Sequence, residues 1–156
     1  MFISMKQRKG FTLIEILIVI GLIAVLAGVL IVALNPARQF AQARDAQRWN
    51  NIDTIMSAVI ANLTDNRGTF TCAAGVIPTT AAKMTSTAGA TNYNIGPCLS
   101  PTYAVSVPFD PSAAGAHWTS TTDYDLNYTI ARDATTGRIT IDAPGAEITR
   151  PINMTR

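Results

Sequence analysis

The sequence predicts an α+β fold, in which one long N-terminal helix packs the second half of its length on a small antiparallel β-sheet. Three patterns predict it: an apolar run over residues 11–34, an apolar stripe at helical spacing from Trp49 to Leu63, and alternating apolar and polar residues over 126–131 and 138–142. A chain of 156 residues has room for one domain and a membrane segment.

The apolar run is long enough to cross a membrane. Its 24 residues carry a single charged side chain, Glu15, and as a helix they would reach about 36 Å, against about 30 Å for a bilayer core. A secretory signal has a shorter apolar core with a small-residue cut site after it. Here the candidate cut site, Gly10, precedes the run, so cleavage there would leave the helix on the mature protein.

The residues around Gly10 closely resemble the class III leader of type IV prepilins and type II secretion pseudopilins. The match is Lys6-Gln7-Arg8-Lys9-Gly10 followed by Phe11-Thr12-Leu13-Ile14-Glu15. In that family a membrane peptidase cuts after the glycine and methylates the new N-terminal amine. The resemblance therefore implies cleavage after Gly10 and an N-methylated Phe11. It also implies a leader over 1–10, a transmembrane or filament-core helix over 11–35 and a pilin head over 36–156.

Glu15 is expected to pair with a cation, because its carboxylate lies in an apolar segment. A charged side chain inside hydrocarbon costs on the order of 2.5–3.5 kcal/mol, so such a residue is normally paired or functional. After cleavage, Phe11 would supply an α-amino cation at the same depth. We expect Glu15 to pair with the Phe11 amine of its own or a neighbouring subunit, which would set axial register in a filament. The alternative is a tolerated glutamate that reaches toward water at the interface.

After the apolar run, Pro36 predicts a kink or break at the membrane exit, because proline removes a backbone donor and disfavours helix at the residue before it. Residues 37–48 are strong helix formers without an apolar stripe and predict a polar neck. The Trp49–Leu63 stripe predicts the spine of the head, ending near Gly68. In a filament, charges of the neck would pair with neighbouring subunits or lie on a solvated face; the candidates are Arg44, Asp45 and Arg48.

Residues 69–101 are rich in Thr, Ala, Gly and Ser and predict a long loop. The two cysteines of the chain, Cys72 and Cys98, both lie in this loop. An even count in an exported, loop-rich region favours one disulfide over two free thiols. It would contribute about 3–4 kcal/mol if unstrained.

Three segments predict strands: 103–107, 126–131 and 138–142. Residues 133–137 lie between the last two and end in glycine, which predicts a hairpin turn. The final residues, 146–156, fit either a short strand or an ordered tail.

Charge and composition exclude several functions. The formal charge is +2, and removal of three leader cations leaves the mature chain close to neutral, so neither nucleic acid nor anionic lipid is expected as an obligatory partner. Lys and Arg residues are equally numerous on the two sides of the predicted membrane span, so their count does not indicate its orientation. The leader and the two cysteines favour a cytoplasmic N-terminus of a single-pass inner-membrane protein.

No catalytic chemistry is expected. His117 is the only histidine, and neither a phosphate-binding loop nor a nucleophile motif occurs. Asp110, Asp123 and Asp125 could approach one another and hold Ca²⁺, but no spaced ligand loop supports this, and solvated turn carboxylates are the better interpretation. We therefore expect no enzyme, no cofactor and no metal site.

The resemblance implies a structural role: a precursor subunit of a type IV pilus-like filament. Its implied partners are further copies of itself, the prepilin peptidase, a pilus assembly platform and an ATPase motor, with the membrane as host before assembly and an extracellular pilus as the destination. Two alternatives stay open. One is a periplasmic pseudopilin of a type II secretion or competence machine, and the other is a membrane-anchored adhesin or DNA-binding minor pilin.

Overall fold

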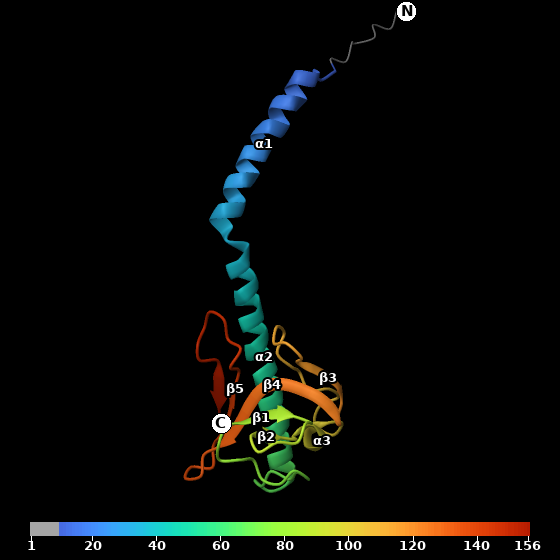
Figure 1. The fold of residues 1–156 in the computed structure, drawn as a ribbon, viewed down its shortest axis with the longest axis vertical. Coiled ribbons are helices and arrows are strands. Elements are labelled where there is room, and N and C mark those ends of the chain that lie inside the picture. The colour runs from blue at the N-terminus through green and yellow to red at the C-terminus, as the bar shows by residue number, and fades with distance from the viewer. Residues whose placement is uncertain (1–9) are drawn as a thin grey trace, which may run out of the picture. The chain divides into compact units, whose positions relative to one another are not determined.

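The computed structural model describes residues 10–156, without the side chains of residues 33 and 34. The expected leader, apart from Gly10, lies outside the described residues. The chain divides into two units, Met1–Gln39 and Phe40–Arg156, and each is described by itself (Figure 1).

Helix α1 (Leu13–Leu34) forms the predicted apolar helix. Its stretch from Leu13 to Val32 is long and apolar enough to span a membrane. Every large apolar side chain from Phe11 to Val32 is exposed.

The helical chain breaks at Asn35, as the following proline predicts. Asn35 adopts a left-handed conformation with φ of 42° and ends α1. Its side-chain oxygen then accepts a hydrogen bond from the backbone N–H of Arg38 at 3.3 Å, in the first turn of the next helix. Asn35 therefore caps both helices, and Pro36 occupies the first position of the second, where its missing N–H costs nothing.

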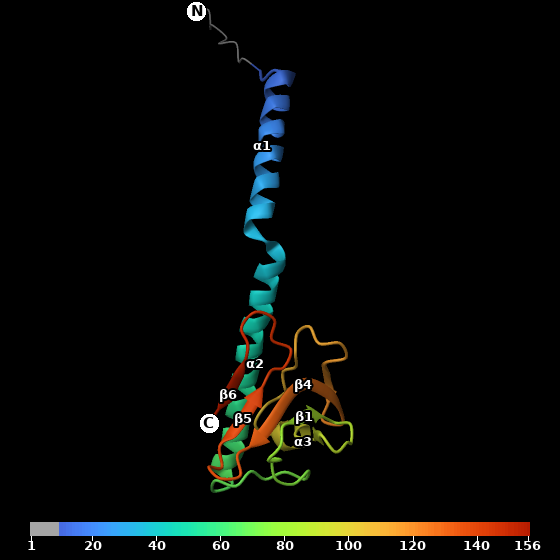
Figure 2. The same cartoon turned by 60° about the vertical axis from the view of Figure 1, so that its left-hand side comes forward.

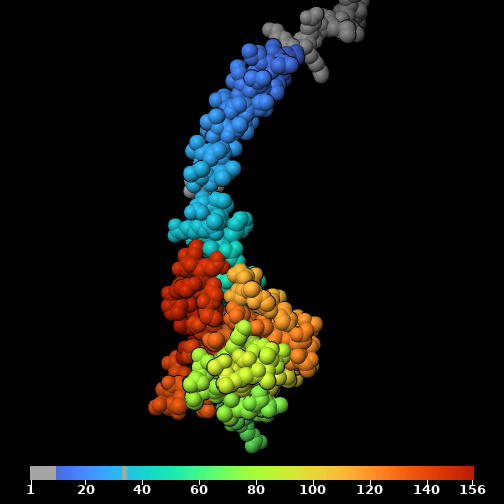
Figure 3. All heavy atoms as spheres, in the orientation of Figure 1, coloured from blue at the N-terminus to red at the C-terminus, as the bar shows by residue number. Residues whose placement is uncertain are grey.

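Helix α2 (Pro36–Asp65) is, from Phe40 onward, the spine of the second unit. The predicted stripe is confirmed: Ile52, Ile55, Met56 and Val59 are at most 1 % exposed. Trp49, at 39 % exposed, marks the edge of the buried face. In the space-filling view, segments from the rest of the head lie in front of this helix beyond its first turns (Figure 3).

Six strands form one sheet beside α2 (Figure 2). The order is β2-β1-β4-β5-β6, with β3 also paired to β4. The strands are β1 (Ala82–Thr85), β2 (Asn92–Tyr93), β3 (His117–Ser120), β4 (Asp123–Arg132), β5 (Ile139–Asp142) and β6 (Asn153–Thr155). All pairs are antiparallel except β1 with β2, which is parallel, so the sheet is mixed rather than purely antiparallel.

Among the strands, β4 supplies the largest share of the core. Its alternate side chains Tyr124, Leu126, Tyr128 and Ile130 are at most 1 % exposed, in the same cluster as the buried face of α2. The predicted hairpin from β4 to β5 is confirmed, with Arg132 opposite Ile139.

The prediction of a strand over 103–107 is wrong. The backbone N–H groups of Tyr103 and Ala104 both donate to the carbonyl of Leu99, which folds this segment into a turn behind the short helix α3 (Gly96–Leu99). Val105 is 92 % exposed, so its β-forming side chain has nothing to pack against.

The expected loop over 69–101 is ordered more than its composition suggests. It contains β1, β2 and α3. Ala82 and Met84 of β1 are buried, and Lys83 on the opposite face lies 2.6 Å from Asp125 of β4. The final segment, left open by the sequence, forms the short strand β6.

The disulfide between Cys72 and Cys98 is confirmed, across a sequence separation of 26. It ties the segment after α2 to α3. Asn62 joins the same region, because its side-chain amide donates to the carbonyls of Thr71 and Cys98 at 3.1 and 3.2 Å.

Replacing both cysteines with serine should lower the free energy of unfolding by about 3–4 kcal/mol, because the unfolded chain regains the entropy that the cross-link removed. Denaturant unfolding of the full chain in detergent, followed by near-ultraviolet circular dichroism, measures this. Reductant should destabilise the wild type by a similar amount and leave the serine variant unchanged. Equal midpoints for the wild type and the variant would contradict the prediction.

Candidate functional site

The N-terminal segment brings three residues of interest into one turn. Gly10 and Phe11 precede α1, and Phe11 is 80 % exposed. Thr12 is the N-cap: its hydroxyl oxygen accepts a hydrogen bond from the backbone N–H of Glu15 at 3.2 Å. Glu15 therefore lies in the first helical turn, where the unpaired N–H groups and the helix dipole favour a negative charge.

This geometry bears on the expected partner of Glu15. In the uncleaved chain the nitrogen of Phe11 is a peptide amide, and cleavage after Gly10 would convert it into an amine one turn from the carboxylate. The pairing itself stays a prediction. The capping role of Thr12 was not predicted, although Thr12-Leu13-Ile14-Glu15 has the spacing of a capping box, which could have revealed it.

A second cluster surrounds Arg48 on α2. The Arg48 side chain is 1 % exposed and forms a two-point contact with Asp110, at 2.8 Å from Nε to Oδ2 and 3.1 Å from Nη2 to Oδ1. Its Nη1 lies 2.8 Å from Asp45 and 3.1 Å from Glu147. The hydroxyl of Ser112 accepts a further hydrogen bond from Nη2 at 2.6 Å. Arg48 thus has a partner for each side of its guanidinium group.

Asp45 holds the C-terminal segment on α2. Its two carboxylate oxygens accept the backbone N–H groups of Glu147, Ile148 and Thr149 at 2.9, 2.7 and 2.9 Å. Burial alone would raise the pKa of Asp45, but these three N–H groups and Arg48 hold it well below its usual range. The carboxylate is therefore charged at neutral pH.

The remaining carboxylates of the cluster behave in the same way. Burial opposes ionisation of Asp110, yet Arg48 and the N–H groups of Ser112 and Ala113 lower its pKa. Arg44 donates from Nε to Glu147 at 2.7 Å, and this contact together with Arg48 lowers the pKa of Glu147 to about 2.

The structure gives these charges partners within the chain. The sequence suggested that Arg44, Asp45 and Arg48 pair with neighbouring subunits or lie on a solvated face. Instead Arg48 and Asp45 are buried, and their partners come from Asp110 and from residues 147–149. Asp45 and Arg48 also pair with each other at helical i, i+3 spacing, but no local pattern reports the other contacts, because those partners are about sixty to a hundred residues away along the chain.

The three aspartates considered for Ca²⁺ do not meet. Asp110 contacts Arg48, Asp125 contacts Lys83, and Asp123 lies 3.1 Å from the ring of His117. Over residues 10–156 the structure contains no group of three or more His, Cys, Asp or Glu side chains placed to hold a metal ion.

Residues 5–31 match the family model of the prokaryotic N-terminal methylation motif. This motif is the class III prepilin leader, the signature of type IV pilins and pseudopilins, so the resemblance seen in the sequence is confirmed. It supports a structural, type IV pilin-like or pseudopilin subunit rather than an enzyme, and its leader and apolar helix fit membrane anchoring before assembly. No curated protein and no solved structure is detectably similar to the chain.

Replacing Arg48 with methionine should lower the free energy of unfolding by about 3–5 kcal/mol, because Asp45 and Asp110 would remain buried without their counter-ion. Chemical unfolding of the full chain measures the loss. Arg156→Met is the matched control, since Arg156 and Asp53 form an ion pair with both side chains 53 % exposed, and such pairs contribute about 0–1 kcal/mol. Similar losses for the two variants would show that burial of the cluster has no special energetic role.

Stability should fall on acidification over a defined range. Since the pKa values of Asp45, Asp110 and Glu147 are lowered in the folded state, the unfolded chain takes up protons first as the pH drops. The contribution of the cluster is complete above about pH 5 and is lost as the pH falls toward about 2. Unfolding curves between pH 7 and pH 3 test this, and Asp45→Asn should show a shallower pH dependence than the wild type.

Proposed function

We propose that this chain, which carries the prepilin leader signature, is the precursor of a structural subunit of a type IV pilus-like filament. The leader comprises residues 1–10, and the peptidase cuts after Gly10 and methylates the amine of Phe11. Residues 11–35 anchor the subunit in the membrane and later form the filament core. Residues 36–156 form the head.

The observation that carries the proposal is an apolar helix without partners directly behind that leader. From Phe11 to Val32 its large apolar side chains are at least 47 % exposed. An apolar surface of this extent marks contact with a membrane or with other protein chains. A single anchor would need only the membrane, whereas the leader signature adds a processing step that creates a new amine beside Glu15.

Glu15 gives assembly its register. In a hydrocarbon environment its carboxylate and the Phe11 amine of a neighbouring subunit would neutralise each other. Only one axial offset between subunits brings the two groups together, so the pair selects that offset over others that bury equal apolar area.

Filament assembly needs a source of free energy other than hydrophobic burial. Moving α1 from lipid into a bundle of like helices exchanges one apolar environment for another, so hydrophobic burial supplies little net driving force. Work must therefore come from the assembly platform and ATPase motor that the resemblance implies. Before assembly the subunit lies in the inner membrane with its N-terminus in the cytoplasm, and afterwards it belongs to an extracellular pilus.

A pseudopilin of a type II secretion or competence machine is the second candidate, because the matched motif is common to pilins and pseudopilins. Mass spectrometry of sheared surface fibres separates the two. Abundant chain in the fibres supports the pilin, and a chain confined to the cell envelope supports the pseudopilin. A mature N-terminus at Met1 instead of Phe11 would overturn both.

Glu15→Gln should reduce the yield of fibres at least about tenfold, since a hydrogen bond to a charged group typically contributes enough free energy for that factor. Quantitative immunoblots of sheared fibres, normalised to the subunit in the membrane, give the yield. Glu15→Asp, which retains the charge, is the matched control and should assemble better than the glutamine variant. Full yield with Glu15→Gln would exclude the proposed ion pair.

A further inference from the structure

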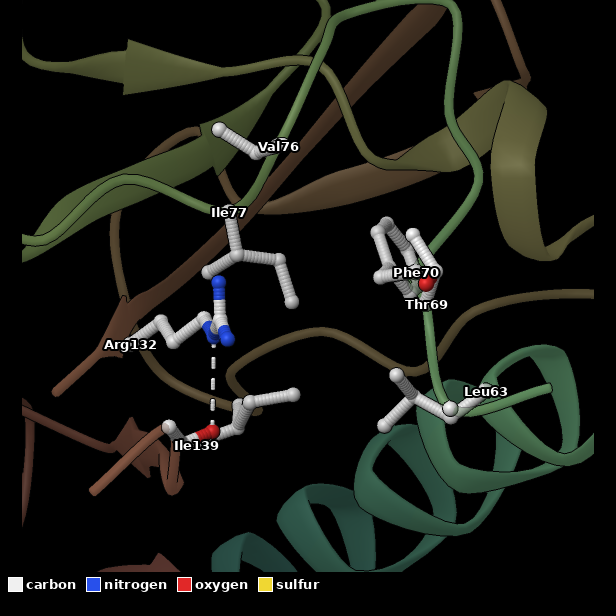
Figure 4. Close-up of a pocket in the computed structure, with 9 residues that line it drawn as sticks. Leu63, Thr69, Phe70, Val76, Ile77, Arg132 and Ile139 are labelled. Atoms are coloured by element: carbon white, nitrogen blue, oxygen red, sulfur yellow. Dashed lines mark hydrogen bonds between the residues drawn. The ribbon is translucent and has the colours of Figure 1, made fainter. Parts of the chain in front are cut away.

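A pocket of about 220 Å³ lies in the head, where the end of α2, the segment after it and the β4–β5 hairpin meet (Figure 4). Its apolar walls come from all three elements: Leu63 from α2, Phe70 and Ile77 from the following segment, and Ile139 from β5. Phe70, Ile77 and Ile139 are at most 8 % exposed, so core side chains form much of the lining.

One cation, the exposed residue Arg132, lies at the edge of this apolar lining. Figure 4 shows the side chain of Arg132 between Ile77 and Ile139. Its Nε donates to the carbonyl of Gly137 at 3.4 Å, which holds the side chain against the hairpin. Within residues 10–156, no carboxylate lies within ion-pair distance of Arg132. Its two terminal nitrogens therefore keep donors for another molecule.

The backbone keeps the space in front of Arg132 open. Gly137 has φ of 73°, which a side chain rarely tolerates, and a Cβ atom there would lie 3.3 Å from a terminal nitrogen of Arg132. Glycine at this turn thus serves the hairpin and leaves the guanidinium group room.

Two further arginines lie nearby, and one of them, Arg156, is paired with Asp53. An adjoining hollow of about 250 Å³ shares Leu63, Gly137 and Ile139 with the pocket and is also lined by Arg138 and Arg156. As far as the structure describes the chain, neither hollow has an aspartate or glutamate in its lining. The carboxylate of the nearby Asp133 accepts hydrogen bonds from the backbone N–H groups of Thr135 and Thr136, within its own turn.

We propose that this pocket binds a small organic carboxylate with an apolar ring or short chain. The carboxylate takes the planar fork of the Arg132 guanidinium group, which matches it with two parallel hydrogen bonds. The apolar part lies on Leu63, Phe70 and Ile77. The size fits, since an apolar cavity of about 150 Å³ holds benzene, whereas drug-sized ligands occupy about 300–1,000 Å³.

The same chemistry could come from a free acid or from the C-terminal residue of another polypeptide. The apolar wall formed by Phe70, Ile77 and Ile139 favours a single ring in either case. Benzoate represents the free acid, and acetyl-glycyl-phenylalanine represents a chain end.

The test uses the full chain in lipid nanodiscs with ¹³C-labelled isoleucine methyl groups. Benzoate should shift the methyl signals of Ile77 and Ile139 and leave those of Ile52 and Ile55, which do not line the pocket, in place. Benzamide, the neutral counterpart, should bind at least about tenfold more weakly, because it cannot form the charged pair. Tighter binding of the peptide than of benzoate would assign the site to a chain end, and the reverse would assign it to a free acid.

Arg132→Gln should weaken benzoate binding at least about tenfold, and Arg132→Lys should weaken it less, since lysine retains the charge without the fork. Arg138→Gln is the matched control and should bind within about twofold of the wild type, because Arg138 lines only the adjoining hollow. Equal shifts with benzoate and benzamide would overturn the proposal, and so would equal losses in the Arg132 and Arg138 variants. The benzoate and benzamide comparison on the wild type decides the matter even if an Arg132 variant fails to fold.

Discussion

The head depends on the buried guanidinium group of Arg48. Around it, the structure gathers one carboxylate from the same helix, one from the segment before β3 and one from the segment before β6. Burying so many charges is costly, and the cost is recovered only because nearly every donor and acceptor has a partner. Removing any one member of the cluster would leave a buried charge without one of its partners. The cluster therefore constrains how the loops pack against α2.

The same cluster explains why the neck of α2 is polar without being a solvated face. Asp45 and Arg48 occupy the positions that would carry apolar residues if the stripe of Ile52 and Ile55 continued toward the N-terminus. At these positions the helix contacts irregular backbone rather than strands. Unpaired N–H groups at 147–149 need acceptors, and a carboxylate supplies them where a leucine could not.

The sequence predicted the elements whose residues repeat with a clear period. The apolar run, the stripe on α2 and the alternation in β4 and β5 each depend on neighbours close in the chain, and each appears in the structure where it was expected. The leader motif was readable for the same reason, since its chemistry lies within ten consecutive residues.

The features that the sequence predicted wrongly or not at all have a common physical cause. Val105 lies in a sequence with strand propensity, but contacts to Leu99 use the backbone groups that a strand would need. Strand β1 has only four residues and gains its stability from pairing with β4. Likewise Arg48 could not be matched with Asp110, nor Arg132 with the pocket around Phe70, because these contacts arise only once distant segments have folded together.

The double cap at Asn35 has a consequence for how such a chain can change over time. In an unbroken helix each inserted residue would rotate the residues after it by about 100° relative to those before it. Asn35 ends the hydrogen-bonded ladder of α1 and starts that of α2. The direction in which the side chains of α2 point is therefore not fixed by the helical repeat of α1. Insertions, deletions and whole-segment exchanges upstream then leave unchanged the hydrogen-bonded ladder that carries Ile52 and its neighbours.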